Sequence, residues 1–276
     1  MPTLYIVPTP IGNLEDITLR ALRVLREVSL IAAEDTRTTI KLLNHYEIKT
    51  PLTSYHEHNK LTKLDAIFAA LASGDVALVS DAGTPGISDP GYELIREAIK
   101  RGVRVEPLPG ANALITALVA SGLPTDGFVF VGFPPRSYSE LRAFWAELAS
   151  EGRTLIAYES PNRLTATLAA ALEILGDRPA CIARELSKIH EEFTRGLLAE
   201  VLVYYTDNPP RGEIVLLIGG ALVQAEAMWD ETRVRAALRE RLNSGEPLKL
   251  AAKTIAALAN WDRREVYALG IQEKEG

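Results

Sequence analysis

A fully apolar segment that runs into a long loop of glycines and prolines constrains the fold of this chain more than any other feature. Residues 76–79 read Val-Ala-Leu-Val, residues 81–91 read Asp-Ala-Gly-Thr-Pro-Gly-Ile-Ser-Asp-Pro-Gly, and a helical pattern follows at 92–99. A strand that is apolar on every residue is typical of a parallel sheet with both faces covered. We therefore expect the loop at the carboxyl edge of an open α/β sheet, where such folds bind their ligands.

The composition of this loop favours a binding site over a simple connection. Gly83, Gly86 and Gly91 let the backbone approach a ligand closely, while Pro85 and Pro90 stiffen the loop. The alternative is an ordinary strand-to-helix turn, but such turns take about two to six residues. We predict a ligand site here.

The first part of the chain alternates short strands with helices, which indicates a mainly parallel sheet. Strands are expected at 4–7, 30–33, 76–80 and 103–107, with helices at 17–28, 60–72 and 109–120. Asp16 or Thr18 can cap the first of these helices. The stretch 121–127 has the glycine and proline content of a linker. We therefore assign residues 1–120 to a first α/β domain.

A second α/β domain is expected at 128–225. Its predicted strands are 128–131, 154–158, 180–184, 197–205 and 213–218, and its predicted helices are 138–149 and 162–175. The later strands leave little room for helices between them, so antiparallel pairing is expected in this half.

The tail, residues 228–276, is expected to form a separate helical module. Short helices are predicted at 233–242, 248–258 and 263–269, and a tight final turn makes the group resemble a helix-turn-helix. Residues 232–276 carry a net charge of +3, whereas the whole chain carries −6. A basic module on an acidic body favours nucleic-acid contact. A plain bundle that closes the fold, or a dimer contact, is the alternative.

Composition and missing motifs exclude several classes of protein. The only cysteine, Cys181, rules out a disulfide framework and any multi-cysteine metal site, and it favours a reducing, cytoplasmic location. No apolar stretch approaches membrane-spanning length. The chain has no Gly-x-Gly-x-x-Gly after a strand, no P-loop, no Gly-x-Ser-x-Gly and no His-Glu-x-x-His. The run at 56–58, His-Glu-His, favours a substrate-edge loop over a metal site, so no metal is expected.

Charged side chains gather directly after three predicted strands, at 34–37, 158–163 and 184–188. Loops at the carboxyl edge of a sheet are suited to substrate contact. The alternative is that these groups are helix caps or solvated ion pairs, since Glu34 and Asp35 would also favour a helix amino terminus.

Five motifs together resemble a known family. They are VPTPIGNLEDIT at 7–18, AEDTRTT at 33–39, SDAGTPGISDPG at 80–91, PGANA at 109–113 and YESPNR at 158–163. In this order they are similar to the small-subunit ribosomal RNA cytidine 2′-O-ribose methyltransferases of the tetrapyrrole-methylase superfamily, the class III S-adenosylmethionine methyltransferases. The resemblance runs nearly end to end, with a helix-turn-helix-like module at the carboxyl terminus.

The resemblance implies two α/β domains with S-adenosylmethionine in the cleft between them, and a homodimer. It implies methyl transfer to the ribose 2′-hydroxyl of a decoding-centre cytidine in 16S rRNA of the small ribosomal subunit. A small-molecule, tetrapyrrole-type methyltransferase on the same scaffold is the alternative because fold does not fix substrate, and the basic tail counts against it. A non-catalytic cofactor-sensing or RNA-binding module is a further alternative.

The resemblance also implies a set of cofactor-binding residues. These are Pro8, Gly12, Asp81, Gly83, Gly86, Asn112, Ala113, Tyr158, Gly212 and Glu213. S-adenosylmethionine carries no phosphate, so a cradle of backbone groups suffices and no phosphate loop is required.

The reaction needs a group that takes the proton from the ribose hydroxyl as the methyl carbon is attacked. Asp35, Glu159, Glu185 and Lys188 are the candidate bases, and the sequence does not choose among them. For the substrate, we expect Arg37 and Arg163 to hold phosphates, and Tyr55 or His56 to stack on a base.

Overall fold

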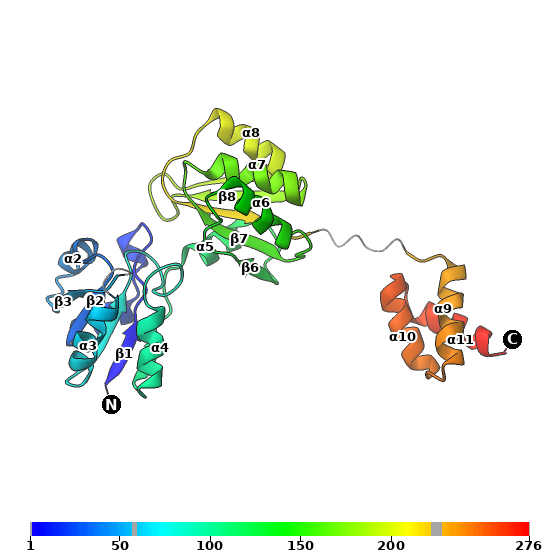
Figure 1. The fold of residues 1–276 in the computed structure, drawn as a ribbon, viewed down its shortest axis with the longest axis horizontal. Coiled ribbons are helices and arrows are strands. Elements are labelled where there is room, and N and C mark those ends of the chain that lie inside the picture. The colour runs from blue at the N-terminus through cyan, green and yellow to red at the C-terminus, as the bar shows by residue number, and fades with distance from the viewer. Residues whose placement is uncertain (1, 57–59, 222–227, 276) are drawn as a thin grey trace. The chain divides into compact units, whose positions relative to one another are not determined.

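The computed structural model describes residues 2–56, 60–221 and 228–275 (Figure 1). Contacts divide the chain into two compact units, Met1–Ala221 and Leu222–Gly276. The first unit contains two five-stranded sheets, and the second is helical. Among the described residues, no helix is long and apolar enough to cross a membrane.

The first sheet is parallel throughout, as predicted. Its strands are β1 (Thr3–Ile6), β2 (Leu30–Ala33), β3 (Leu52–Ser54), β4 (Val76–Val79) and β5 (Arg104–Pro107), in the order β3-β2-β4-β1-β5. The strand β3 was not predicted because its three residues Leu-Thr-Ser are half-buried and show no apolar alternation.

Helices cover both faces of this sheet (Figure 1). They are α1 (Leu19–Glu27), α2 (Thr36–His45), α3 (Lys60–Leu71) and α4 (Tyr92–Lys100), with a short 3₁₀ turn, η1, at Leu14–Asp16. Along β4, Ala77 and Val79 pack with α1 and α2, whereas Val76 and Leu78 pack with α3 and α4. The strand β4 is therefore apolar on every residue because helices cover both of its faces, as predicted. Thr18 caps α1 by accepting a hydrogen bond from the Ala21 amide.

The second sheet is mostly antiparallel. Its strands are β6 (Phe128–Phe130), β7 (Thr154–Glu159), β8 (Pro179–Arg184), β9 (Glu192–Leu197) and β10 (Ile214–Ile218), in the order β6-β7-β10-β8-β9. Only the β6–β7 pair among these is parallel. The expected antiparallel pairing of the later strands is confirmed.

One predicted strand is wrong. Residues 197–205 form most of the helix α8 (Leu198–Asp207), and the strand at this edge is β9, which ends at Leu197. Leu198, Val201 and Tyr205 are buried at helical spacing, so one face of the helix packs on the sheet. Glu200 accepts a hydrogen bond from the Leu197 amide and fixes the helix start.

The helices of this half lie on opposite faces of the second sheet. α6 (Tyr138–Glu147), α7 (Leu164–Leu175) and α8 pack on one face, and α5 (Ala113–Ser121) packs on the other. Leu114 and Leu118 of α5 contact a cluster that includes Cys181, which is completely buried. Since α5 packs with the second sheet, we propose that the first domain ends before this helix rather than after residue 120. The other predicted domain boundaries stay predictions.

The second unit is a three-helix module, and its three predicted helices are confirmed. They are α9 (Glu231–Asn243), α10 (Leu248–Ala259) and α11 (Arg263–Glu275). Val234, Leu238, Ile255 and Val266 are buried at its centre.

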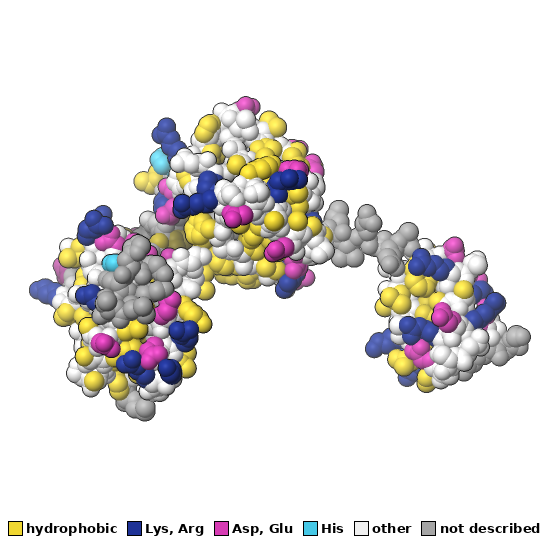
Figure 2. Space-filling model, in the orientation of Figure 1, with side chains coloured by type: hydrophobic (Ala, Val, Ile, Leu, Met, Phe, Trp, Pro, Cys, Tyr) yellow, Lys and Arg dark blue, Asp and Glu magenta, His cyan; other side chains and the backbone are white. Residues whose placement is uncertain are grey.

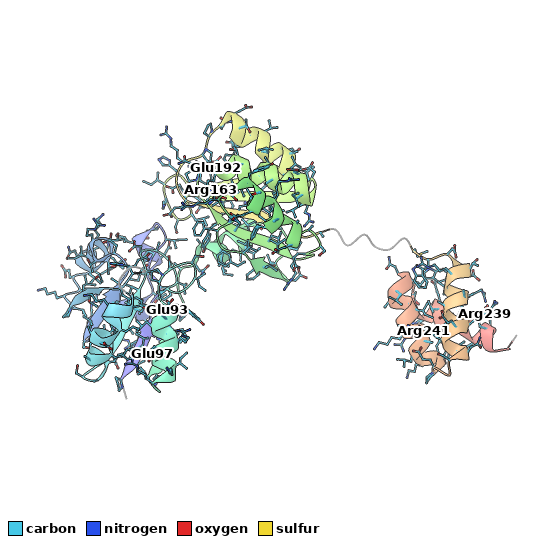
Figure 3. All side chains as sticks on the ribbon, viewed as in Figure 1. Glu93, Glu97, Arg163, Glu192, Arg239 and Arg241 are labelled. Carbon is cyan, nitrogen blue, oxygen red and sulfur yellow. The ribbon has the colours of Figure 1, made fainter. Side chains whose placement is uncertain are left out.

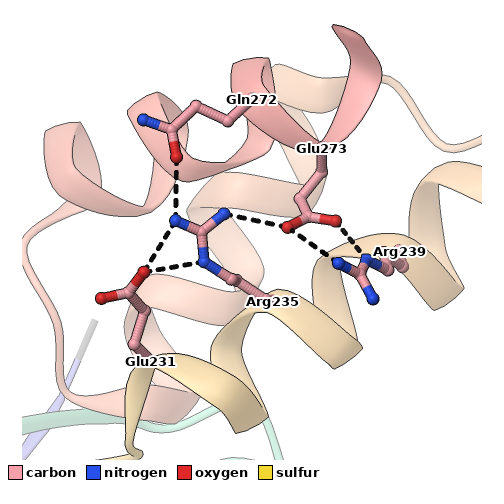
Figure 4. A network of polar contacts seen from close by, with 5 residues as sticks. All are labelled: Glu231, Arg235, Arg239, Gln272 and Glu273. Carbon is pink, nitrogen blue, oxygen red and sulfur yellow. Dashed lines mark hydrogen bonds and ion pairs between the residues drawn. The ribbon is translucent and has the colours of Figure 1, made fainter. Parts of the chain in front are cut away.

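Polar contacts tie the first and last helices of this module together (Figure 4). Arg235 of α9 bonds Glu231 on its own helix, and it reaches Gln272 at 2.8 Å and Glu273 at 2.9 Å on α11. Arg239 pairs with the same Glu273. These arginines therefore support the module from within.

Candidate functional site

A cavity of about 370 Å³ lies where loops at the carboxyl edge of the first sheet meet one face of the second sheet. The loop after β4 contributes residues 82–84 and 87–89, and the start of α5 contributes residues 112–113. The second sheet contributes residues 158–161 at the end of β7 and residues 212–215 at the start of β10. The site predicted for the loop 81–91 thus coincides with a cavity.

Hydrogen bonds hold the loops on the first side of this cavity. The Thr9 and Gly83 backbones exchange two bonds of 2.9 Å, and the Thr9 hydroxyl donates to the Ser80 carbonyl at 3.1 Å. Thr84 donates to the Ala111 carbonyl at 3.2 Å. Gly83 has a φ of +79°, in the left-handed region that favours glycine. The loop is therefore built around a backbone shape that other residues adopt poorly.

The walls of the cavity combine apolar surface with a few polar groups. Ile11, Leu186 and Val215 line it with aliphatic side chains. Tyr158 is half-buried, and its ring contacts Phe133 with centroids 5.6 Å apart. Burial raises the pKa of the Tyr158 phenol. Among the described residues that line the cavity, none is Lys, Arg or His.

Six of the predicted cofactor residues line the cavity together. These are Gly83, Asn112, Ala113, Tyr158, Gly212 and Glu213. Asn112 also caps α5, because its side chain accepts hydrogen bonds from the Leu114 and Ile115 amides.

The other four predicted cofactor residues support the cavity from outside its walls. Pro8 packs on Gly110, where an added Cβ would lie 2.7 Å from the proline ring. Gly12 lies against Lys188, whose Cγ would be 2.5 Å from a Cβ at that position. Asp81 follows β4, and Gly86 has a φ of +84° in the middle of the loop.

Glu159, a predicted base, lines the cavity but its carboxylate is used within the chain. One oxygen accepts from the Ser160 amide at 2.7 Å, and the other accepts from the Thr167 hydroxyl at 2.5 Å. Arg163 lies 3.4 Å from the same carboxylate, and the Glu159 side chain has no exposed surface. Both carboxylate oxygens of Glu159 are therefore already bonded within the chain.

Glu185 and Lys188, two further predicted bases, neutralise each other. Lys188 Nζ lies 2.9 Å from Glu185 Oε1 and 3.0 Å from Glu213 Oε2. The hydrogen bond from Lys188 lowers the pKa of Glu185. Burial opposes the charge on Lys188, but its bonds to the two carboxylates outweigh burial and raise its pKa. An amine held in the charged form is a poor proton acceptor.

Asp35, the remaining predicted base, caps α2 and pairs with Arg37. Its carboxylate accepts from the Arg37 amide at 2.8 Å and from the guanidinium at 2.6 Å. The side-chain bond to Arg37 lowers the pKa of Asp35 to about 2. Asp35 therefore has the contacts of a helix cap, which was the alternative given for this position. It is not among the residues that line the cavity.

Two of the predicted substrate residues, Arg37 and His56, have side-chain surface exposed to solvent. The other two are buried (Tyr55) or bonded within the fold (Arg163). Arg37 is 88% exposed in its side chain, and His56 is partly buried. Tyr55 is completely buried, so its ring offers no face to a base, contrary to the prediction. Arg163, labelled in Figure 3, donates to the carbonyls of Pro134 and Pro135 at 2.7 Å each. The Arg163 guanidinium is therefore bonded to groups near the second sheet rather than left available for a phosphate. Glu57 and His58 lie outside the described residues.

Sequence reasoning did not single out Asp89, which lines the cavity from the loop after β4. Burial, followed by the nearby charges of Glu34 and Asp81, raises the pKa of Asp89 to about 7. The signal in the sequence was its position in the predicted ligand loop. Asp81 belongs to the same loop, but Glu34 follows β2, and only the fold brings it near Asp89.

Comparison with known proteins gives a consistent family. The model of the tetrapyrrole (corrin/porphyrin) methylases matches residues 3–202. A protein of Halalkalibacterium halodurans is 49% identical over 98% of this chain and 95% of its own length. A protein of Synechocystis is 46% identical over 99% and 98%, and one of Bacillus subtilis is 46% identical over 97% and 93%. Each of the three is named ribosomal RNA small subunit methyltransferase I.

Solved structures of low sequence identity share the fold. A cobalt precorrin-4 methyltransferase superposes with a TM-score of 0.59 at 14% identity, covering 79% of this chain and 94% of that one. A uroporphyrin-III C-methyltransferase of Thermus thermophilus, complexed with S-adenosyl homocysteine, gives 0.54 at 22% identity, covering 79% and 97%. From the matched family model and the near full-length relatives, this chain belongs to the tetrapyrrole methylase family.

Proposed function

We propose that this protein is an S-adenosylmethionine-dependent methyltransferase that methylates the ribose 2′-oxygen of a cytidine in 16S rRNA of the small ribosomal subunit. The observation that carries the proposal is the 43–49% identity, over nearly the whole chain, to relatives named for small-subunit rRNA methylation. The cytidine, its place in the decoding centre and the 2′-oxygen come from the motif resemblance.

The cavity has the chemistry that S-adenosylmethionine requires. When bound, this molecule supplies a methyl group on a positively charged sulfonium. A volume of about 370 Å³ falls within the usual range for small-molecule sites, about 300–1,000 Å³. Glu213 pairs with Lys188, which lies outside the lining. Asp89 is acidic and the described lining residues include no cation, so the charge of Asp89 favours a positively charged ligand. The residues present therefore fit the cofactor.

The residues that line the cavity are proposed to hold and orient the methyl donor. Gly83, Asn112 and Ala113 form one side, while Tyr158, Gly212 and Glu213 form the other. Pro8, Gly12, Asp81 and Gly86 are proposed to fix the loops that carry them. Orientation of the reacting atoms is the main contribution of the chain, and such alignment can lower a barrier by about 7–11 kcal/mol.

RNA binding is proposed to use exposed cations outside the cavity. Arg37 lies at the amino terminus of α2, and His56 lies in the loop after β3. Lys249, Lys253 and Arg264 of the helical module are also exposed. In Figure 2, dark-blue Lys and Arg side chains and yellow hydrophobic side chains alternate over this module. We also propose that the protein forms a homodimer and that it is located in the cytoplasm.

The test is to offer the purified protein three substrates with methyl-labelled S-adenosylmethionine. Small ribosomal subunits, protein-free 16S rRNA and uroporphyrinogen are incubated in parallel. Label should enter RNA, and digestion to nucleosides should place it in 2′-O-methylcytidine. Transfer to uroporphyrinogen alone would favour the small-molecule alternative, and binding without transfer to any substrate would favour a non-catalytic module. Analytical ultracentrifugation tests the dimer.

A further inference from the structure

Four carboxylates follow β2 and β4 at the carboxyl edge of the first sheet, and three of them are held by other groups. Asp35 pairs with Arg37. Asp81 Oδ1 accepts from the Asp35 amide at 3.0 Å, and Glu34 Oε2 accepts from the Asp81 amide at 3.3 Å. These bonds link the loops after the two strands. The fourth carboxylate, Asp89, lies in the cavity wall.

The described neighbours that influence Asp89 are acidic or neutral. Glu34 approaches from the loop after β2, and Asp81 and Ser80 approach from the end of β4, with Ser80 as a hydrogen-bond partner. Tyr158 faces it from β7 in the second sheet, across the cavity. Among the described residues, no cation pairs with Asp89. Among the residues that the structure describes, its carboxylate therefore has no counterpart to the cations that pair with Asp35, Glu159 and Glu185.

The balance of these neighbours gives Asp89 the protonation behaviour of a base at neutral pH. Burial is the main cause that raises its pKa to about 7, with Glu34 and then Asp81 adding to it, while the Ser80 hydrogen bond acts in the opposite direction. A general base works best when its pKa lies near the operating pH. Around neutral pH, much of Asp89 is ionised and still basic enough to accept a hydroxyl proton.

We propose that Asp89 is the general base of the methyl transfer, accepting the proton of the ribose 2′-hydroxyl from its place in the cavity wall. This assignment rests on the proposed function. As the proton moves to the carboxylate, the 2′-oxygen forms a bond to the methyl carbon and the carbon–sulfur bond breaks. The bonding pair goes to sulfur, which becomes the neutral thioether of S-adenosylhomocysteine. Asp89 then releases its proton to water.

The experiment compares full-length wild type with Asp89→Asn, which keeps the shape of the protonated side chain. Single-turnover methylation of small subunits is measured from pH 5.5 to 9, with S-adenosylhomocysteine affinity measured by calorimetry. For wild type, the rate should rise about tenfold per pH unit below 7 and level off above it. Asp89→Asn should be slower by about 100-fold or more at pH 8, with no such rise and an unchanged affinity.

Two further variants separate catalysis from structure. Asp89→Glu keeps a carboxylate and should retain part of the rate together with the rise with pH. Asp65→Asn, at an exposed carboxylate on α3, should behave as wild type.

The assignment is overturned if Asp89→Asn keeps more than a third of the wild-type rate, keeps the rise with pH, or fails to bind S-adenosylhomocysteine. It also fails if Asp89→Glu is as inactive as Asp89→Asn. Failure of the proposed function is distinct, because wild type itself would then leave the RNA unlabelled.

Discussion

Thr9 and Gly83 are joined by two backbone hydrogen bonds of 2.9 Å, one in each direction, outside either sheet. This bridge fastens the loop after β1 to the loop after β4. The bridge couples these two loops, so moving the Gly83 loop away to relieve a substitution there would break both bonds.

Replacement of Gly83 by Val should abolish tight binding of the cofactor. Gly83 has a φ of +79°, where a residue with a Cβ is strained by about 1–2 kcal/mol. The added Cβ would lie 3.5 Å from Cγ2 of Ile11, which also lines the cavity. We expect affinity for S-adenosylhomocysteine to fall at least tenfold by calorimetry. Gly102→Val is the matched control because Gly102 has a φ of +71° and nothing within 4 Å of an added Cβ. Wild-type affinity in a folded Gly83→Val protein would remove this loop from the cofactor site.

Arg37→Ala should reduce methylation of RNA while leaving cofactor affinity unchanged. The Arg37 side chain is 88% exposed and pairs with Asp35, which lies outside the cavity, so a phosphate contact would position substrate alone. RNA affinity measured by filter binding should fall and lose part of its salt dependence. Arg23→Ala, at an exposed pair with Glu27 on α1, serves as the control. Equal effects of the two variants would argue against a specific role for Arg37.

Arg163→Ala should act on stability instead. Removing the guanidinium leaves the Pro134 and Pro135 carbonyls without their donor and leaves Glu159 buried without its cation. Loss of hydrogen bonds to a charged group costs about 2–3 kcal/mol, which urea unfolding would detect as a lower midpoint. An unchanged midpoint together with weaker RNA binding would restore the phosphate role predicted from the sequence.

Asp89→Asn should stabilise the fold at high pH. The folded-state pKa of Asp89 is about 7, whereas an unfolded aspartate titrates near about 3.9. The wild-type fold therefore binds more protons than the unfolded chain between these values and loses stability as pH rises through them. The gain in melting temperature from Asn should be absent near pH 4, grow up to pH 7 and stay constant above it. A gain that is the same at every pH would mean that Asp89 is not buried as described.

The helical module should contribute to RNA binding through exposed cations on α10 and α11. Lys249, Lys253, Arg263 and Arg264 are exposed, and no ion pair is found for them among the described residues. Replacing Lys249 and Lys253 together by Ala should weaken binding of 16S rRNA and lower the salt slope by about 2. A variant ending at Ala227 should still bind S-adenosylhomocysteine and methylate RNA poorly.

The control for this prediction uses arginines that are already paired. Arg239 and Arg241, both labelled on α9 in Figure 3, bond Glu273 and Glu246. Their replacement by Ala should lower the melting temperature of the module with little change in the salt slope. If the Lys variants methylate at full rate with an unchanged slope, the module is structural.

The sequence predicted the architecture well where burial and chain order decide it. The strand 76–79 and the loop that follows it were placed correctly because a short run that is apolar on every residue needs cover on both of its faces, which a parallel sheet between helices provides. The pattern at 197–205 failed because a run with two aromatic and several aliphatic residues suits a strand or a helix, and packing on the second sheet decided for the helix α8.

The chemistry of the site was less predictable because it depends on contacts between distant segments. Lys188 lies in the loop after β8, and it bonds Glu213, which directly precedes the neighbouring strand β10. Nothing in the local sequence of either segment indicates this contact. The pKa of Asp89 is raised first by burial and then by Glu34, which is close only because β2 and β4 are neighbours in the sheet. Residue type and position identified the candidate bases, but only the fold shows which of them are paired with other side chains.

The burial of Cys181 has a practical consequence for experiments on this protein. Its thiol is completely buried beneath α5, and burial raises the pKa of that thiol to about 11. Reagents such as maleimides react with accessible thiolate, so they should not label the native chain. A cysteine introduced at an exposed position such as Met228 would therefore carry the only fluorophore on the molecule, and RNA binding by the helical module could be followed without altering the native cysteine.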